Sequence, residues 1–122
     1  MSTTDRRALR PQIETAPATT AEEACQNTTL RPVLKMQHEL LVQAFEHYLQ
    51  KRKTPWAKFD AQGRAAHILH SVRKDRMLRQ LLLGIVVGQF TADELVAYFA
   101  NESALQRRLG KLLEQRLVDA LG

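Results

Sequence analysis

The sequence predicts an all-α fold, a bundle of about five helices with a flexible N-terminal arm. Apolar residues recur at steps of three and four along most of the chain, which is the period of one helix face, and no segment shows the sustained alternation of a strand. Residues that cap helix N-termini stand at the start of several of these segments. With 44% apolar and 25% charged residues, the chain has the composition of a globular domain.

Residues 1–19 are predicted to form the flexible polar arm, and residues 20–122 a single helical domain. The arm shows no helical or strand period, and Pro11 and Pro17 interrupt any pattern that begins there. No apolar segment of a signal peptide occurs near the N-terminus. We therefore expect a cytoplasmic protein.

Thr20 and Glu23 have the spacing of a capping box, so a short helical turn is predicted to begin there and to end near Cys25. The chain is expected to restart at Asn27 or Thr28. Cys25 is the only cysteine, which excludes an intrachain disulfide and a cysteine-based zinc site. The neighbouring glutamates oppose the lowered pKa of a reactive thiol, so an inert structural thiol is expected.

A long first helix is predicted from Leu30 to about Lys51. Pro32 falls in its first turn, where the missing N–H is tolerated, and Pro55 disfavours helical backbone just after its end. The apolar residues that give this segment its helical period are Leu30, Val33, Leu34, Leu40, Leu41, Ala44, Phe45, Tyr48 and Leu49.

Asp60 is predicted to cap a second helix, and Asp75 a third helix that runs to about Gln89. The third helix is apolar almost all round between Leu81 and Val87, so we expect it to be the central and most buried element. The same run is far shorter than the roughly 20 apolar residues of a bilayer span, so no membrane partner is expected.

Two further helices are predicted to begin at capping-box patterns, the fourth at Thr91 and Glu94 and the fifth at Ser103 and Gln106. Both segments carry an apolar side. Its residues are Leu95, Val96, Tyr98 and Phe99 in the fourth helix and Leu105, Leu109, Leu112, Leu113, Leu117 and Ala120 in the fifth.

Positive charge is concentrated in residues 51–79, which hold nine basic and two acidic residues in a chain of net charge +5. Basic side chains that displace counter-ions, interleaved with aromatic rings that stack on bases, suit a nucleic acid or another anion. The alternative is that these side chains lie on separate solvated faces, with Trp56 packed against Phe59. The candidate binding residues are Lys51, Arg52, Lys53, Trp56, Lys58, Arg73, Lys74, Arg76 and Arg79.

His67 and His70 are the candidates for metal ligands, because a spacing of three residues places two imidazoles near each other on a helix. A third ligand would have to come from the first helix. Both histidines fall opposite the apolar stripe of the second helix, so we expect them to face solvent. The sequence thus predicts no metal and no cofactor.

Two polar residues fall within apolar stripes, Gln37 in the first helix and Arg116 in the fifth. In one interpretation, Gln37 is hydrogen-bonded and Arg116 extends its charged group to solvent near a helix end. In the other, the two stripes continue into a homodimer or partner interface, where one polar residue sets the register. Both interpretations stay open. The candidate interface residues are Gln37, Leu41, Tyr48 and Arg116.

Enzyme signatures are missing from the sequence: we find no nucleophile elbow, P-loop, dinucleotide fingerprint or evident carboxylate pair, and so no catalytic residue is predicted. This favours a small non-catalytic interaction protein that self-associates as a homodimer or binds a protein partner. The alternatives are a nucleic-acid-binding protein that uses residues 51–79, and a metal-binding or enzymatic helical bundle.

Three segments carry a resemblance to a known family: Asn27–Leu41, Gly88–Thr91 and Asn101–Leu105. From about Glu22 onward the chain resembles a family of short uncharacterised all-helical bacterial proteins, some of which carry a glyoxalase label. Glyoxalase modules place their His and Glu metal ligands on strands, and this sequence predicts none. The resemblance implies a bacterial, cytoplasmic, helical protein and carries no active site across.

Overall fold

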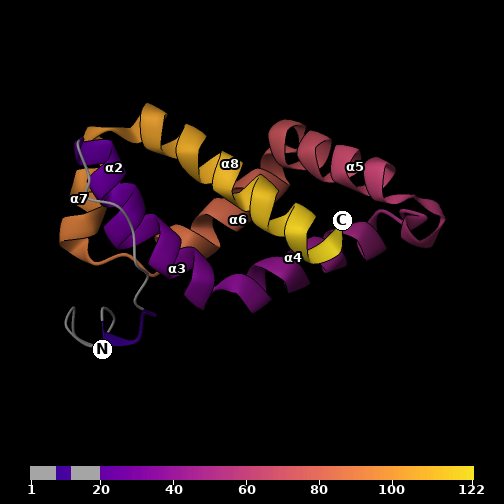
Figure 1. Cartoon of the computed structure of the whole chain (residues 1–122), viewed down its shortest axis with the longest axis horizontal. Helices are drawn as coiled ribbons and strands as arrows, with labels where there is room; N and C mark the ends of the chain where they lie inside the picture. Colours follow the sequence, from indigo (N-terminus) through magenta and orange to yellow (C-terminus); the bar gives the residue numbers. More distant parts are fainter. Residues whose placement is uncertain (1–7, 12–19) are drawn as a thin grey trace.

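The computed structural model describes residues 8–11 and 20–122, and all the regular structure in these residues is helical (Figure 1). The elements are α2 (Ala21–Cys25), a π-helical turn (Gln26–Leu30), α3 (Arg31–Met36), α4 (His38–Lys51), a 3₁₀ turn (Trp56–Lys58), α5 (Ala61–Lys74), α6 (Arg76–Val87), α7 (Ala92–Ala100) and α8 (Glu102–Leu121). The predicted all-α class is confirmed. None of the described helices combines the length and apolar content of a membrane span.

The first part of the bundle is continuous where a break was predicted. The chain does not restart at Asn27 or Thr28, because α2 passes through the π-helical turn directly into α3. At the end of that turn the Arg31 N–H donates to the Gln26 carbonyl, five residues back. The Thr28 hydroxyl donates to the Ala24 carbonyl at 2.7 Å, so it satisfies the preceding turn and does not cap a new helix.

A break does occur inside the predicted helix from Leu30 to Lys51. Gln37, with φ −93° and ψ 8°, leaves the helical region between α3 and α4. Its side chain Nε2 donates to the carbonyl of Ile85 in α6 at 3.2 Å. The polar residue predicted within the apolar stripe therefore has a partner inside the chain, and the break turns α4 along α6.

Side-chain caps set most of the other helix starts as predicted. Asp60 and Asp75 each accept a hydrogen bond from the backbone N–H three residues on, at 2.6 Å and 3.1 Å. Thr91 and Glu94 form a complete capping box, with bonds of 2.9 Å and 3.2 Å in the two directions. These three starts are confirmed.

The start of α8 differs from the prediction. The helix begins at Glu102, one residue before Ser103, and its N-cap residue Asn101 makes no side-chain capping bond. Gln106 was expected to close a capping box with Ser103. Its Nε2 instead donates to Glu102 at 3.3 Å, a bond between neighbouring turns on the helix surface.

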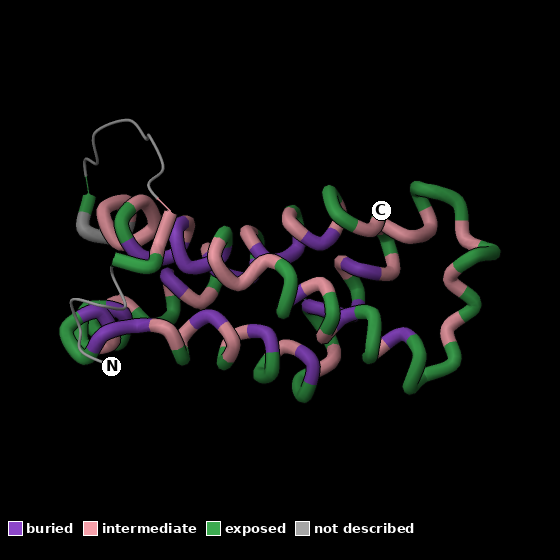
Figure 2. The backbone as a smooth tube through the Cα atoms, turned by 90° about the horizontal axis from the view of Figure 1, so that it is seen from below, coloured by how far each residue is buried: buried purple, intermediate pink, exposed green. Residues whose placement is uncertain are grey.

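The helix α8 is the central element of the bundle, and α6 is not. Figure 1 shows α2 and α7 together at one end of the molecule and the α4–α5 turn at the other, with α8 running between them. It packs against α4, α5, α6 and α7. Buried and exposed positions alternate along the long helices in Figure 2. The buried side chains of α8 are Leu105, Leu109, Leu113, Glu114 and Leu117.

Within α6, by contrast, burial is confined to one face. Leu78, Leu82 and Val86 are buried, whereas Met77 and Leu81 keep 80% and 52% of their surface exposed. The expectation that the third helix is the most buried element was therefore wrong. An apolar run predicts a buried helix only if neighbours cover every side, and here the outer side of α6 is left open.

Candidate functional site

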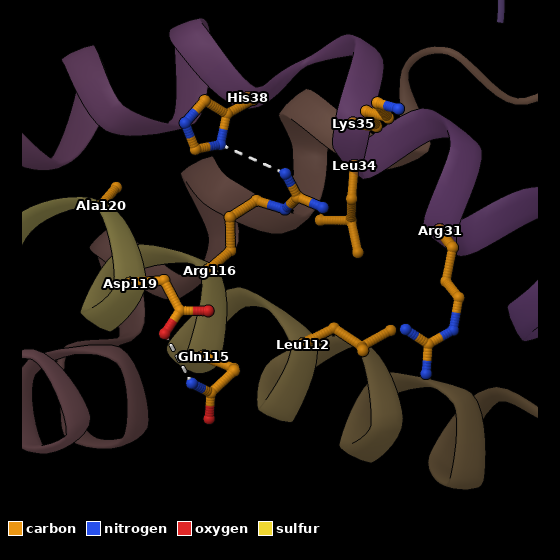
Figure 3. A pocket seen from close by; sticks show the side chains of 9 residues that line it. All are labelled: Arg31, Leu34, Lys35, His38, Leu112, Gln115, Arg116, Asp119 and Ala120. Atoms are coloured by element: carbon orange, nitrogen blue, oxygen red, sulfur yellow. Dashed lines mark hydrogen bonds between the residues drawn. The ribbon is translucent and has the colours of Figure 1, made fainter. Parts of the chain in front are cut away.

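A groove with a cavity volume of about 580 Å³ separates α3 and the start of α4 from the C-terminal half of α8 (Figure 3). Three cations, Arg31, Lys35 and Arg116, contribute to its lining, against one carboxylate, Asp119. Its other lining residues are Leu34, His38, Leu112, Gln115 and Ala120. The groove is therefore positively charged with a partly apolar wall.

The helix pattern explains how Arg116 reaches the groove. The α8 residues Leu113 and Leu117, before and after it in the chain, are completely buried. Arg116 is half-buried, so it lies at the edge of the buried face of α8. Figure 3 shows its side chain extending from α8 toward Leu34 and His38 on the opposite wall. Because the chain breaks at Gln37, one wall combines side chains from two helices, α3 and α4.

Arg116 is bonded to a neutral group. Its Nη1 lies 3.2 Å from Nδ1 of His38. A guanidinium has only N–H donors, so Nδ1 must accept, which requires an unprotonated Nδ1 and thus the Nε2–H tautomer in this pairing. Burial lowers the pKa of Arg116, and the charge of Arg31 acts in the same direction, against that of Asp119. Among residues 8–11 and 20–122, no carboxylate oxygen forms an ion pair with Arg116.

The remaining candidate interface residues do not share a surface with Arg116. Leu41 is completely buried, so it belongs to the core and lies on no exposed face. Tyr48 is half-buried, with its ring 5.7 Å from that of Phe45 and the Arg52 guanidinium 5.0 Å from its centre. These side chains are engaged within the chain.

An exposed apolar surface does follow the seam between α4 and α6. We define the α4–α6 strip as Leu40, Met77, Leu81 and Gly84. Leu40 is 51% exposed, and a Cβ added to Gly84 would meet no atom within 4 Å, so the space beside Gly84 is open. The bond from Gln37 to Ile85 places the start of α4 beside the end of α6, which brings Leu40 and Leu81 to the same seam. Sequence reasoning placed Leu40 in the apolar stripe of the first helix and Leu81 in the apolar run of the third, but it marked neither as an interface residue.

The basic residues within 51–79 are distributed over several elements, and several of the arginines bond to other residues of the chain. Arg52 pairs with Asp75 at 2.5 Å and Arg73 with Glu114 at 2.7 Å. The Arg79 guanidinium lies against Gly110 and donates to the Gln106 carbonyl at 3.3 Å. The exposed cations that remain come from the end of α4, the 3₁₀ turn and the α5–α6 junction: Lys51, Lys53, Lys58, Lys74 and Arg76.

Trp56 and His67 belong to an aromatic cluster. Trp56 is half-buried, with ring centroids 6.3 Å from Phe45, 5.7 Å from Phe59 and 5.9 Å from His67. The expectation that His67 faces solvent was therefore wrong, because the 3₁₀ turn folds Trp56 and Phe59 over it. Its Nε2 is buried without a hydrogen-bond partner in the described part of the chain, and burial lowers its pKa. His70 is exposed, as expected.

A metal site would need a third ligand near His67 and His70. In the described residues, no three His, Cys, Asp or Glu side chains gather closely enough to hold a metal ion. Cys25 is half-buried, and burial raises the pKa of its thiol, with the charge of Glu94 adding to the effect. A thiol with a raised pKa is a poor nucleophile at neutral pH.

A buried ion pair that sequence reasoning missed joins the N-terminal arm to the bundle. Arg10 donates to the Glu94 carboxylate at 2.5 Å and 2.7 Å and to the Gln89 carbonyl at 2.7 Å. The side chains of Arg10 and Glu94 are only 5% and 9% exposed. The arm was predicted to be loose, and Arg10 is docked; residues 1–7 and 12–19 lie outside the described residues.

The carboxylate of Glu94 is held ionised by this environment. Burial alone would raise its pKa, but hydrogen bonds from Arg10 and the Thr91 N–H, the charge of Arg10 and the Thr29 hydroxyl lower it to about 2. Thr29 donates to it at 3.1 Å from the π-helical turn. Glu94 was predicted as a capping residue, but nothing in the local pattern marks Arg10 as its partner.

No protein-family model, curated protein or solved structure matches the chain. The resemblance to a family of short bacterial proteins therefore stays a prediction.

Proposed function

We propose that this chain is a small helical interaction protein that self-associates through the α4–α6 strip. The observation that carries the proposal is the exposure of three large apolar side chains, Leu40 on α4 and Met77 and Leu81 on α6, on two helices that pack against each other. Single exposed apolar residues are common on protein surfaces. A group that follows one seam is typical of a surface that another molecule covers.

The apolar character of the strip favours a second copy of the chain as the occupant. Two molecules of net charge +5 repel each other at long range, and an interface without charged side chains adds least to that repulsion. The four strip residues carry no charge, and neither do the exposed Gln43 and Gln80 near them, whereas the exposed Glu39 and Arg76 directly precede Leu40 and Met77 in the chain. In a two-fold interface each patch meets its own equivalent, so apolar side chains face apolar side chains.

Gly84 supports close helix packing in such a dimer. With no side chain at this position, α6 of a second molecule can approach the backbone without displacing any atom of the first. Leu81 and Met77 lie one and two turns before Gly84, where they reach the same partner helix. The strip is small, so the expected affinity is on the order of micromolar.

The test is the molar mass by light scattering after size-exclusion chromatography, from about 1 µM to about 300 µM, a range that brackets micromolar affinity. We predict a shift from one chain to two as concentration rises. Leu81→Asp places charges against each other across the interface and should abolish the shift. Gly84→Gln should do the same without loss of fold, because its Cβ enters open space.

Val96→Asp is the matched control. It makes the same kind of change at an exposed apolar residue, 70% exposed, on α7 and outside the strip. It should dimerise like the unmodified chain. A monomer at every concentration would refute self-association, and dimers in all three variants would place the interface elsewhere. Absorbance at 260 nm that disappears as salt rises would instead favour nucleic-acid binding by the exposed residues among 51–79.

A further inference from the structure

The groove between α3–α4 and α8 holds a cation, Arg116, that forms no ion pair with a carboxylate of the described chain. Arg10, Arg52 and Arg73 each form such a pair, whereas Arg116 is bonded to the ring of His38 and is attracted by Asp119 only through its charge. Arg79 and Arg108 also bond neutral oxygens, but neither lines the groove. A half-buried guanidinium without a counter-ion costs solvation free energy that a neutral imidazole only partly offsets. An anion in the groove would supply the missing charge.

The neighbouring charges strengthen this field. Arg31 and Lys35 stand on the α3 wall, one turn apart, and both contribute to the lining of the groove. Figure 3 shows Arg31 extending from α3 toward Leu112 on α8. Asp119 is the one carboxylate in the lining, and its Oδ1 accepts a hydrogen bond from Gln115 at 2.8 Å. The groove therefore keeps a positive balance.

The size and wall of the groove restrict the ligand. A cavity of about 580 Å³ is in the range of small-molecule sites. Leu112 and Ala120 line it beside the cations and suit an aliphatic part next to the charged group, whereas Leu34 is almost fully buried. A guanidinium binds carboxylate and phosphate groups through two parallel hydrogen bonds, which is a geometry that a chloride ion does not offer.

We propose that the groove is a binding site for a small organic anion, with Arg116 binding its carboxylate or phosphate group and Arg31 and Lys35 adding long-range attraction. Leu112 and Ala120 contact its aliphatic part. This site is separate from the α4–α6 strip, so it does not depend on self-association.

Thermal unfolding followed by Trp56 fluorescence tests the site with three probes at equal ionic strength: sodium succinate, sodium phosphate and sodium chloride. At about 10 mM, succinate or phosphate should raise the melting temperature by about 3 to 6 °C relative to chloride, as expected for a millimolar dissociation constant. Calorimetric titration then gives the dissociation constant directly. A larger effect of succinate assigns the site to carboxylates, and a larger effect of phosphate to phosphate groups.

Arg116→Gln should weaken the binding at least tenfold and remove the temperature shift. Arg107→Gln makes the same change of charge on the same helix at an exposed residue that does not line the groove, so it should keep the shift. Lys35→Gln, at an exposed groove residue, should weaken binding about three- to tenfold without affecting the fold. No shift with either anion beyond chloride, or equal losses in the Arg116 and Arg107 variants, would overturn the proposal.

Discussion

Arg10 has a buried side chain and Arg116 is half-buried, and the two arginines have different partners. Arg10 is 5% exposed and meets the Glu94 carboxylate through two hydrogen bonds, with the Gln89 carbonyl as a third acceptor. Arg116 is half-buried beside a groove, and its hydrogen-bond partner among the described residues is the imidazole of His38, while Asp119 attracts it only through its charge. In the described part of the chain, one arginine forms an ion pair and the other does not.

This difference separates a charge that holds the fold together from a charge that is free for a ligand. Removal of one member of a buried ion pair leaves the other uncompensated, which costs far more than the pair contributes by itself. Removal of a half-buried cation that has no counter-ion relieves a desolvation cost instead. The Arg10–Glu94 pair should therefore govern stability, and Arg116 should govern binding.

The largest effect is expected for Glu94→Gln. The change leaves Arg10 buried opposite a neutral amide, whose single acceptor oxygen replaces the two carboxylate oxygens that accept from Arg10, Thr29 and the Thr91 N–H. We predict a loss of about 3 to 4 kcal/mol in the free energy of unfolding, measured by urea denaturation with circular dichroism. Asp93→Asn is the control, because Asp93 is an exposed residue in the same first turn of α7; a comparable loss in both variants would contradict the account.

A smaller effect is expected on acidification. The pKa of Glu94 in the folded chain is about 2, below its ordinary value of 4.5, so its ionisation stabilises the fold fully above about pH 4.5. That contribution should fall away as the pH drops from about 4.5 to about 2. We predict a loss of about 2 to 3 kcal/mol over this interval, measured by urea denaturation at a series of pH values. Glu94→Gln should flatten the profile; an unchanged slope would show that other carboxylates dominate.

The parts of the fold that local rules determine were predictable from the sequence. Asp60, Asp75 and Thr91 each cap a helix within three residues of chain, and such short-range bonds leave a recognisable pattern. The stripe of α8 was also predictable, because its leucines recur with the helical period and are buried. Long-range partners leave no such pattern.

The candidate sites depend on those long-range partners. Arg10 and Glu94 are far apart in the sequence, and no period or motif connects them. Gln37, where the helix breaks, bonds to a carbonyl in α6, and the local sequence does not show this partner. Because the break was not predicted, the groove wall that combines α3 and α4 was not predicted either. Arg116 was recognised as a polar residue within an apolar stripe, but its environment required the fold. The apolar run of α6 predicted a helix buried on all sides. This was wrong because the sequence does not show which side lacks a covering helix.

The central claim is most directly tested by comparing the free energies of unfolding of Arg10→Met and Arg116→Met in a buffer without carboxylates or phosphates. Methionine keeps much of the aliphatic volume of arginine and removes its charge. We predict that Arg10→Met loses about 3 kcal/mol, because Glu94 stays buried without a counter-ion, whereas Arg116→Met stays within about 1 kcal/mol of the unmodified chain or gains stability. Equal losses in the two variants would contradict the account, because Arg116 would then be a structural charge like Arg10.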